Sequence, residues 1–198
     1  MQLIKKPNEQ PARGCQFGFF VIYLVHTEIY IRKGNSMQIR KAAEGDLPSI
    51  LKIYAIAREY MRQSGNPDQW GTKKPPRELL EDDIQKGELF VGEDENGEIH
   101  FVFAFILGED PTYAYIENGA WLSDAPYGTI HRIASDGTVR GTVRAAVAFA
   151  RETISNIRID THEKNTTMQH VLDKLGFQKC GIIYIADGTP RIAYQLLS

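Results

Sequence analysis

A continuous run of strand, helix and strand between residues 129 and 161 constrains the fold of this chain more than any other feature. The apolar stretch TIHRIAS at 129–135 leads through the turn DGTVRG into an alanine-rich helix, and a second apolar stretch, NIRIDT, follows at 156–161. The apolar side chains of the helix recur on one face at helical spacing: Val143, Ala146, Val147, Ala150 and Ile154. Because such a face must be buried, the run predicts a helix packed on a sheet.

The other predicted elements place this run in a larger sheet. Strands are expected over 37–42, on both sides of the hairpin turn DENG at 94–97, and on both sides of DGTP at 187–190. Helices are expected after the N-cap Asp46, over RELLEDDI at 77–84, and from the N-cap Asn165 to the stop at Gly176. The order predicts an α+β fold with a single mixed, mostly antiparallel central sheet and helices on both faces.

The length of the chain, 198 residues of which 42% are hydrophobic, allows one sizeable core. We expect residues 37–198 to form that domain, because Met37 begins a strand that a capped helix follows. Residues 1–36 are then an N-terminal extension outside the core domain. The apolar segment 15–31 is interrupted by polar residues, and no small-residue cleavage site follows it. These features argue against a transmembrane helix and against a secretory signal.

Charge and cysteine content limit the partners of the protein. A net charge of -2 gives no reason to expect binding to nucleic acid or to an anionic membrane. The two cysteines, Cys15 and Cys180, stand far apart without the spacing of metal ligands. We therefore expect no metal and a reducing, cytoplasmic compartment. A homodimer is compatible with the sequence, and any anion-binding site must be local.

The helix start at Gly141 is the candidate for such an anion site. The first turn of a helix offers backbone N–H groups without partners and the positive end of the helix dipole. Arg140 and Arg144 add positive charge on either side of Gly141, whose lack of a side chain lets the backbone approach a ligand closely. An ordinary helix start beside two solvated arginines has the same sequence, so spacing alone leaves both interpretations open.

The stretch RGTVRA at 140–145 resembles the acetyl-CoA signature of the GNAT superfamily of N-acetyltransferases, Arg/Gln-x-x-Gly-x-Gly/Ala. Arg140 and Ala145 match this signature, whereas Val143 stands where the signature has glycine. The stretch IAS before it is similar to the strand that pairs with pantetheine in the family. The pattern N-x-x-M followed by GF at 165–177 resembles a later region of the same family, and the predicted order of elements is also that of the family.

The resemblance implies that the cofactor is acetyl-CoA and that backbone groups hold it. The residues implied in pyrophosphate binding are Arg140, Gly141, Thr142, Val143, Arg144 and Ala145. Those implied along the pantetheine arm and at the thioester carbonyl are Ile133, Ala134, Ser135 and Asn165. The side chain of Val143 leaves two alternatives open: the residue supplies its N–H from a helical conformation, or its isopropyl group crowds the pyrophosphate.

Acetyl transfer to an amine requires a base, because an ammonium group has no lone pair. His131 is the first candidate, since the family commonly carries its base on this strand and histidine titrates near neutral pH. A hydrogen-bonded structural histidine is the alternative, and Glu117 and His162 are competing bases. Many relatives carry a general-acid tyrosine four residues before the glycine of GF. Leu172 takes that position here, so we expect Tyr184 to substitute as the proton donor.

Three aromatic residues of the long loops, Trp70, Trp121 and Tyr127, are expected to form walls of the acceptor site. For each of them, packing of a loop against the core is the alternative. The predicted function is an acetyl-CoA-dependent N-acetyltransferase that acts on a primary amine of a small molecule or peptide. The alternative is a catalytically weak or inactive CoA-binding sensor or scaffold with the same fold.

Overall fold

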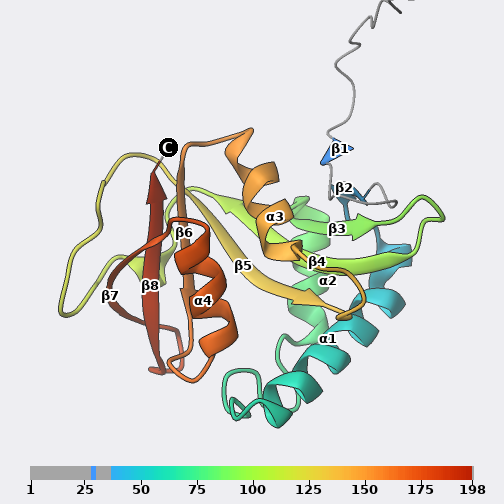
Figure 1. Ribbon diagram of the computed structural model, residues 1–198, viewed down its shortest axis with the longest axis horizontal. Helices are drawn as coiled ribbons and strands as arrows, with labels where there is room; N and C mark the ends of the chain where they lie inside the picture. The colour runs from blue at the N-terminus through green and yellow to red at the C-terminus, as the bar shows by residue number, and fades with distance from the viewer. Residues whose placement is uncertain (1–27, 30–36, 198) are drawn as a thin grey trace, which may run out of the picture.

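The computed structural model describes residues 28–29 and 37–197 of the chain (Figure 1). The helices are α1 (Leu47–Gln63), α2 (Arg77–Lys86), α3 (Thr142–Arg151) and α4 (Thr166–Lys174). The strands are β1 (Glu28–Ile29), β2 (Met37–Lys41), β3 (Leu89–Glu93), β4 (Ile99–Leu107), β5 (Gly128–Ser135), β6 (Asn156–Thr161), β7 (Gln178–Tyr184) and β8 (Pro190–Leu197). Short 3-10 turns cover Glu44–Asp46 and Pro111–Tyr113.

These strands form one sheet in the order β1-β2-β3-β4-β5-β6-β8-β7. Neighbouring strands are antiparallel except β5 and β6, which run parallel on either side of the α3 crossover. The predicted α+β fold with a mixed, mostly antiparallel sheet is therefore confirmed. β1 falls within the segment 1–36 that we predicted as an extension, and it pairs with β2. The rest of that segment lies outside the described residues.

Helices cover both faces of the sheet, as predicted. α3 and α4 lie on one face, and α1 and α2 lie on the other (Figure 1). On the α3 side, Phe103 of β4 stacks on Phe90 and meets Phe149 of the helix, with ring centroids 5.6 and 5.9 Å apart. On the opposite side, Ile50 and Tyr54 of α1 are fully buried in a second apolar cluster. Burial of both faces fixes the register of the sheet between them.

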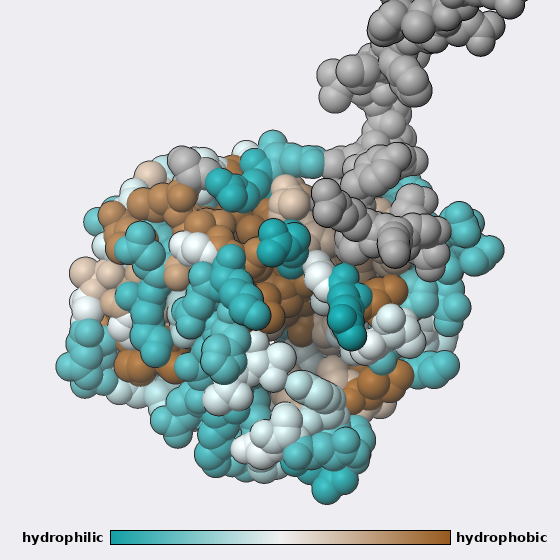
Figure 2. Space-filling view, in the orientation of Figure 1, coloured by the Kyte–Doolittle hydropathy of each residue, from teal (hydrophilic) through white to brown (hydrophobic). Residues whose placement is uncertain are grey.

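The surface over α3 and α4 is mostly hydrophilic, with apolar side chains visible between the hydrophilic ones (Figure 2). This pattern is typical of amphipathic helices that turn their apolar stripe toward a sheet. In the part of the chain that the structure describes, no helix combines the length and the apolar character needed to cross a membrane. The apolar stretch 15–31 belongs, apart from residues 28–29, to the segment outside the described residues.

Candidate active site

The strands β5 and β6 separate soon after they begin to pair, and this separation opens a cavity. Their ladder holds only Gly128 opposite Ile157 and Thr129 opposite Arg158. Beyond these pairs the strands line a cavity of about 510 Å³ together with the loop after α1 and the β7–β8 turn. Ile130, His131, Arg132 and Ile133 of β5 all lie along it. The outer half of β5 therefore leaves its backbone on the β6 side unpaired by that strand.

A β-bulge in β5 sets the direction of the side chains that line this cavity. Ala104 of β4 faces His131 and Val102 faces Ala134, so two residues of β5 lie opposite one residue of β4. One of the two, Arg132, has a φ of 54°, in the left-handed region that side chains other than glycine rarely adopt. The bulge brings consecutive residues of β5 to the same cavity.

Contacts from both helices of the opposite face hold the bulge. The hydroxyl of Tyr54 in α1 donates a hydrogen bond of 2.8 Å to the carbonyl oxygen of Arg132. The guanidinium of Arg132 contacts the two carboxylate oxygens of Asp83 in α2 at 3.0 and 2.8 Å. Burial raises the pKa of Asp83, and the positive charge of Arg132 opposes that rise. The strained residue is thus anchored through both its backbone and its side chain.

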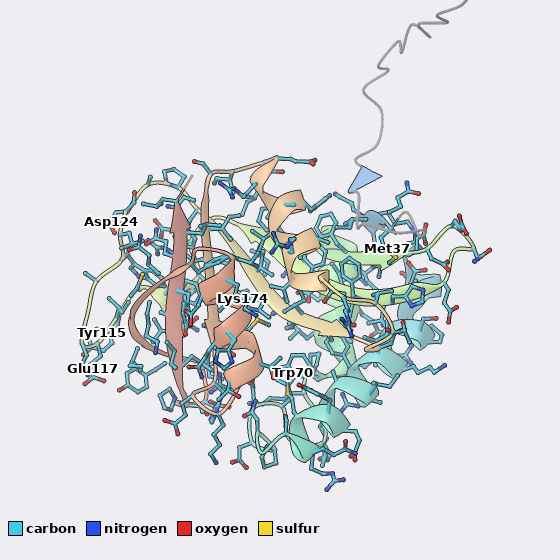
Figure 3. All side chains as sticks on the ribbon, viewed as in Figure 1. Met37, Trp70, Tyr115, Glu117, Asp124 and Lys174 are labelled. Atoms are coloured by element: carbon cyan, nitrogen blue, oxygen red, sulfur yellow. The ribbon has the colours of Figure 1, made fainter. Side chains whose placement is uncertain are left out.

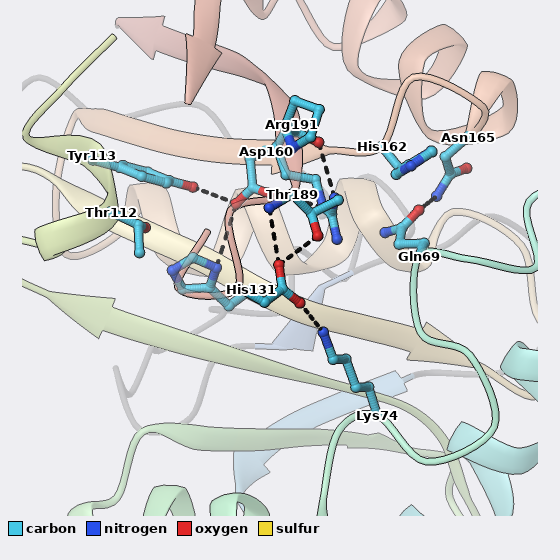
Figure 4. Close-up of polar contacts among 12 residues, drawn as sticks. Gln69, Lys74, Thr112, Tyr113, His131, Asp160, His162, Asn165, Thr189 and Arg191 are labelled. Atoms are coloured by element: carbon cyan, nitrogen blue, oxygen red, sulfur yellow. Dashed lines mark hydrogen bonds and ion pairs between the residues drawn. The ribbon is translucent and has the colours of Figure 1, made fainter. Parts of the chain in front are cut away.

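His131 lies in the cavity between two carboxylates. Its Nε2 is 2.8 Å from Oδ2 of Asp110. Its Nδ1 is 3.7 Å from Oδ1 of Asp160 (Figure 4). Burial raises the pKa of Asp110, but hydrogen bonds from His131 and Thr112 outweigh that effect and lower it to about 2. An ionised carboxylate only accepts hydrogen bonds, so Nε2 of His131 donates to Asp110; in the neutral tautomer that this contact selects, Nδ1 holds the lone pair.

Tyrosines hold both aspartates, Asp110 through its backbone and Asp160 through its carboxylate. The hydroxyl of Tyr127 accepts a hydrogen bond from the backbone N–H of Asp110 at 2.9 Å. The hydroxyl of Tyr113 donates to Oδ1 of Asp160 at 2.8 Å, and burial raises the pKa of this tyrosine well above its usual value. Tyr113 therefore stays protonated and can act as a donor to Asp160. Sequence analysis identified neither carboxylate as a site residue.

The predicted acceptor wall is only partly at the cavity. Trp70 lines it and packs edge-on against Tyr54, with ring centroids 5.5 Å apart. Trp121 and Tyr127 do not line it, which corrects our prediction for these two residues. Their rings enclose the guanidinium of Arg158 at 3.9 and 3.8 Å from the ring centroids, so they form a layer behind the cavity.

Two of the predicted catalytic residues lie elsewhere. Glu117 accepts a hydrogen bond from the hydroxyl of Tyr184, and its backbone pairs with Ile182 of the edge strand β7. Neither side chain lines the cavity, and Figure 3 shows Glu117 beside Tyr115 at the edge of the molecule, away from Trp70. The structure therefore gives Glu117 and Tyr184 no place beside His131. The other competing base, His162, is also outside the cavity lining, and burial lowers its pKa.

The start of α3 offers the backbone groups predicted for an anion. Gly141 has a φ of 82° at the N-cap, and the first intrahelical bond runs from the N–H of Ala145 to its carbonyl at 2.9 Å. The N–H groups of Thr142, Val143 and Arg144 consequently have no partner within the helix. The N–H of Ala145 is used inside the helix, which corrects our prediction for that residue. Arg140 and Arg144 are exposed beside this turn.

A buried histidine anchors the loop that leads to this helix start. Nδ1 of His100 in β4 is 2.9 Å from Oδ2 of Asp136 and 3.0 Å from Oγ1 of Thr138. Burial disfavours the ionised form of Asp136, but hydrogen bonds from Thr138 and His100 outweigh it and lower the pKa of Asp136. The loop after Ser135, whose Oγ accepts from the N–H of Gly137, is thereby fixed to the β3–β4 hairpin. The helix start is held in place before any ligand arrives.

The side chain of Val143 packs against the core cluster beneath α3 rather than standing free at the helix start. Val143→Gly should therefore lower the free energy of unfolding by about 1 kcal/mol, because glycine weakens a helix and the core loses an apolar side chain. The affinity for CoA should not rise, as measured by calorimetric titration. Thr142→Gly is the matched control for added backbone freedom in the same turn. Tighter CoA binding by the Val143 variant alone would show that its side chain crowds the ligand.

Asn165 caps α4, as the sequence predicts. Its Oδ1 accepts from the N–H of Met168 at 3.1 Å, and its Nδ2 donates to Oε1 of Gln69 at 3.1 Å. It also lines the cavity, so the predicted contact with a cofactor arm stays a prediction.

Asn165→Ala should lower the free energy of unfolding by about 1 kcal/mol, because the helix loses its N-cap. Asn165→Asp retains a capping oxygen, so its free energy of unfolding should fall much less. Urea denaturation measures both variants, and an equal fall in the two would contradict the capping role.

Comparison with solved structures supports one family. An acetyltransferase of the GNAT family from Streptococcus agalactiae is 37% identical, with 82% of this chain and 95% of that chain covered and a TM-score of 0.74. A putative acetyltransferase from Staphylococcus aureus is 25% identical over 80% of this chain and 97% of that one, with a TM-score of 0.58. A GNAT-family acetyltransferase from Listeria monocytogenes shares the fold at 21% identity, 87% and 100% coverage, and a TM-score of 0.66.

Neither a protein-family model nor a curated protein sequence matches the chain. The similarity to the streptococcal protein nevertheless extends over 95% of that protein and 82% of this chain, at 37% identity. The chain therefore belongs to the GNAT family of acetyltransferases.

Proposed function

We propose that the protein transfers the acetyl group of acetyl-CoA to a primary amine of a small molecule or peptide. The observation that carries this proposal is the pairing of His131 with Asp110 inside the cavity where β5 leaves β6. A base held in one tautomer, beside a groove with free backbone groups, is what an acyl transfer to an amine requires.

The residues present fit acetyl-CoA, which supplies its acetyl group as a thioester when bound. The N–H groups of Thr142, Val143 and Arg144 would bind its phosphates, and Arg140 would add charge from the exposed side. No atom lies within 4 Å of the position that a Cβ would take at Gly141, so no side chain obstructs this turn. The outer half of β5, from Ile133 to Ser135, would pair with the pantetheine arm.

The proposed mechanism assigns the proton to Nδ1 of His131. Asp110 fixes the proton of the imidazole on Nε2, which leaves the Nδ1 lone pair as the base. An ammonium group bound near Asp160 loses its proton to Nδ1 and becomes nucleophilic. The imidazolium that forms lies between Asp110 and Asp160, which stabilise its charge. Asp110 is thus a positioning residue, whereas His131 is the catalytic base.

Leu172 supports a second candidate function. It occupies the position where many relatives carry a general-acid tyrosine, and in this structure it is buried in the core under α4. Without that phenol, the protein could bind CoA as a sensor or scaffold and transfer nothing. The leaving thiol, with a pKa near 8.5 if it resembles cysteine, departs without strong help, which favours the enzyme over the sensor.

Two measurements test the proposed function and separate it from this alternative. A thermal shift experiment should show stabilisation by acetyl-CoA and CoA but not by ATP, because only a ligand that binds the folded state raises the melting temperature. A thiol-release assay with a broad panel of amines should then detect CoA. Stabilisation by the ligands without release of CoA in the presence of any amine would indicate the sensor. A melting temperature that neither acetyl-CoA nor CoA raises would contradict both functions.

A further inference from the structure

Arg191 is a cation of the cavity that lacks a close carboxylate partner. Three basic side chains line the cavity, and two of them have short ion pairs: Lys74 with Asp187 at 2.5 Å, and Arg132 with Asp83 at 2.8 Å. The nearest carboxylate oxygen to Arg191 is Oδ2 of Asp160, 4.0 Å from its Nε. Its hydrogen bond among the described residues goes from Nη1 to the carbonyl of Pro190 at 2.9 Å.

This arginine is buried although its donors are largely unused. Its side chain is only 5% exposed, and burial lowers its pKa. A guanidinium carries five N–H donors and stays charged in proteins, so an underused one in a buried position favours an anion. Arg158, the other buried arginine near the site, differs because the rings of Trp121 and Tyr127 cover both sides of it and Ser123 accepts from it. In the described residues, Arg191 has no such aromatic cover.

The position of Arg191 relative to the base is defined by one carboxylate. Oδ1 of Asp160 is 3.7 Å from Nδ1 of His131, and Oδ2 is 4.0 Å from Nε of Arg191. Figure 4 shows Asp160 between these two residues. Tyr113 fixes the same carboxylate by donating to Oδ1. The imidazole of His131 and the guanidinium of Arg191 are therefore separated by the carboxylate of Asp160. A molecule that carries an amine and a carboxylate on one carbon can reach both.

We propose that the acceptor is a free amino acid, with its carboxylate bound by Arg191 and its ammonium group by Asp160. This inference rests on the proposed function and specifies its substrate class. A planar guanidinium matches a carboxylate in a bidentate contact, and Asp160 offers an Oδ2 without a hydrogen bond in the structure. In a peptide the α-carboxylate of the first residue is an amide, so its amino terminus offers Arg191 no charge at this distance.

The proposed reaction balances with the groups present. The ammonium group of the amino acid releases one proton to Nδ1 of His131, which passes it to solvent. The nitrogen forms a bond to the acetyl carbon as the carbon–sulfur bond of the thioester breaks. A second proton leaves the nitrogen and ends on the sulfur of CoA. The products are an N-acetyl amino acid, CoA and one proton, and no oxidant, reductant or metal is needed.

The ion pair of Lys74 with Asp187 limits the size of this acceptor. Lys74 precedes α2 and Asp187 lies in the β7–β8 turn, so their contact joins two loops that both line the cavity. Thr189 donates through its N–H and its hydroxyl to the other oxygen of Asp187, and hydrogen bonds from Lys74 and Thr189 hold the pKa of Asp187 low. The carboxylate of Asp187 therefore stays ionised at neutral pH, and its contact with Lys74 holds the two loops together at the cavity.

The test compares an amino acid with two analogues that lack its carboxylate. The free amino acids are first assayed as acceptors with acetyl-CoA, and the best one is then compared with its amide and with the amine formed by its decarboxylation. The kcat/KM of the amino acid should exceed that of both analogues by roughly 10- to 100-fold, as expected for hydrogen bonds to a charged group. Equal values for the three compounds would overturn the inference.

Variants of Arg191 give an independent measurement. Arg191→Met should raise the KM for the amino acid by roughly 10- to 100-fold, and it should change the KM for the decarboxylated amine much less. Arg191→Lys keeps the charge and should restore part of the preference, which separates recognition from a general loss of folding. Lys86→Met, at an exposed lysine that pairs with Asp82 outside the cavity lining, should retain the preference. An unchanged preference in Arg191→Met would contradict the proposal.

The outcomes separate this inference from the proposed function. Transfer to amines without regard to a carboxylate would leave the acetyltransferase standing and remove Arg191 as its specificity residue. Calorimetric titration of the CoA-bound protein with the amino acid measures acceptor binding without any transfer of an acetyl group. Loss of this binding in Arg191→Met is the expected result, and undetectable binding to the wild-type protein in that form would refute the amino acid as acceptor.

Discussion

His131→Gln should reduce kcat/KM for acetyl transfer by about 10²- to 10⁴-fold, which is the usual contribution of a general base. The affinity for CoA should stay close to that of the wild-type protein, because the free N–H groups of α3 lie on a different element. His170→Gln is the matched control, since this histidine is exposed on α4. Thiol release at several pH values and titration with CoA measure the two quantities.

The pH dependence adds a second criterion for His131. A base accepts a proton only in its unprotonated form, so any acid limb that His131 gives to the pH–rate profile of the wild-type protein should be absent from the residual activity of His131→Gln. A variant that keeps the wild-type rate would contradict the role of His131, and a variant that loses CoA binding as well would point to damage of the fold.

Arg132→Met should lower the free energy of unfolding by about 3–5 kcal/mol, because it leaves the buried carboxylate of Asp83 without its partner. Methionine retains much of the apolar stem, so the charge is the main loss. Arg77→Met provides the control at an exposed ion pair with Glu81, where the cost should stay below about 1 kcal/mol. Urea denaturation of both variants and of the wild-type protein measures the difference.

The loss in Arg132→Met should depend on pH in a defined direction. Burial already raises the pKa of Asp83, and Arg132 opposes that rise, so the variant should raise it further. A carboxyl group with a higher pKa in the folded state binds protons more readily there, and its contribution to stability falls as the pH rises through that pKa. The destabilisation should be largest at neutral pH and smaller in mildly acid solution. A loss independent of pH would indicate disturbed packing instead.

Much of the fold could be predicted from the sequence because its periodicity is local. The alternation of strands and helices, the hairpin at DENG, the cap at Asn165 and the stop at Gly176 all occur where the residues indicate them. Asp46 is an exception in detail. It stands before α1, but its carboxylate binds Arg40 and the N–H of Ala43 rather than the first turn of the helix. The guanidinium of Arg40 on β2 binds the carboxylate that would otherwise cap the helix.

The cavity was harder to predict because its residues meet only in the tertiary structure. His131 was found through its strand, but Asp110 comes from a loop and Asp160 from the end of β6. A polar residue at the end of the buried run NIRIDT was the available signal for Asp160. The bulge at Arg132 has no sequence signal, because arginine seldom adopts a positive φ.

Residue type alone misplaced other candidates. Glu117 and Tyr184 have suitable chemistry for a base and a donor, yet the pairing of the loop with β7 brings them together at the outer edge. Trp121 and Tyr127 seemed suited to a binding wall, but both rings instead pack on the guanidinium of Arg158, which lies in the middle of β6. The partner that decided each outcome is distant along the chain.

The last strand of the described chain, β8, lies between β6 and β7 rather than at the edge of the sheet. During synthesis on a ribosome, β6 therefore lacks its neighbour on that side until residues 190–197 have emerged. The side of the cavity that Arg191 forms is completed last, after the β7–β8 hairpin docks onto β6. A nascent chain can thus assemble the half of the domain that precedes β6 early, whereas the side of the cavity around Arg191 forms only after residues 190–197 have emerged.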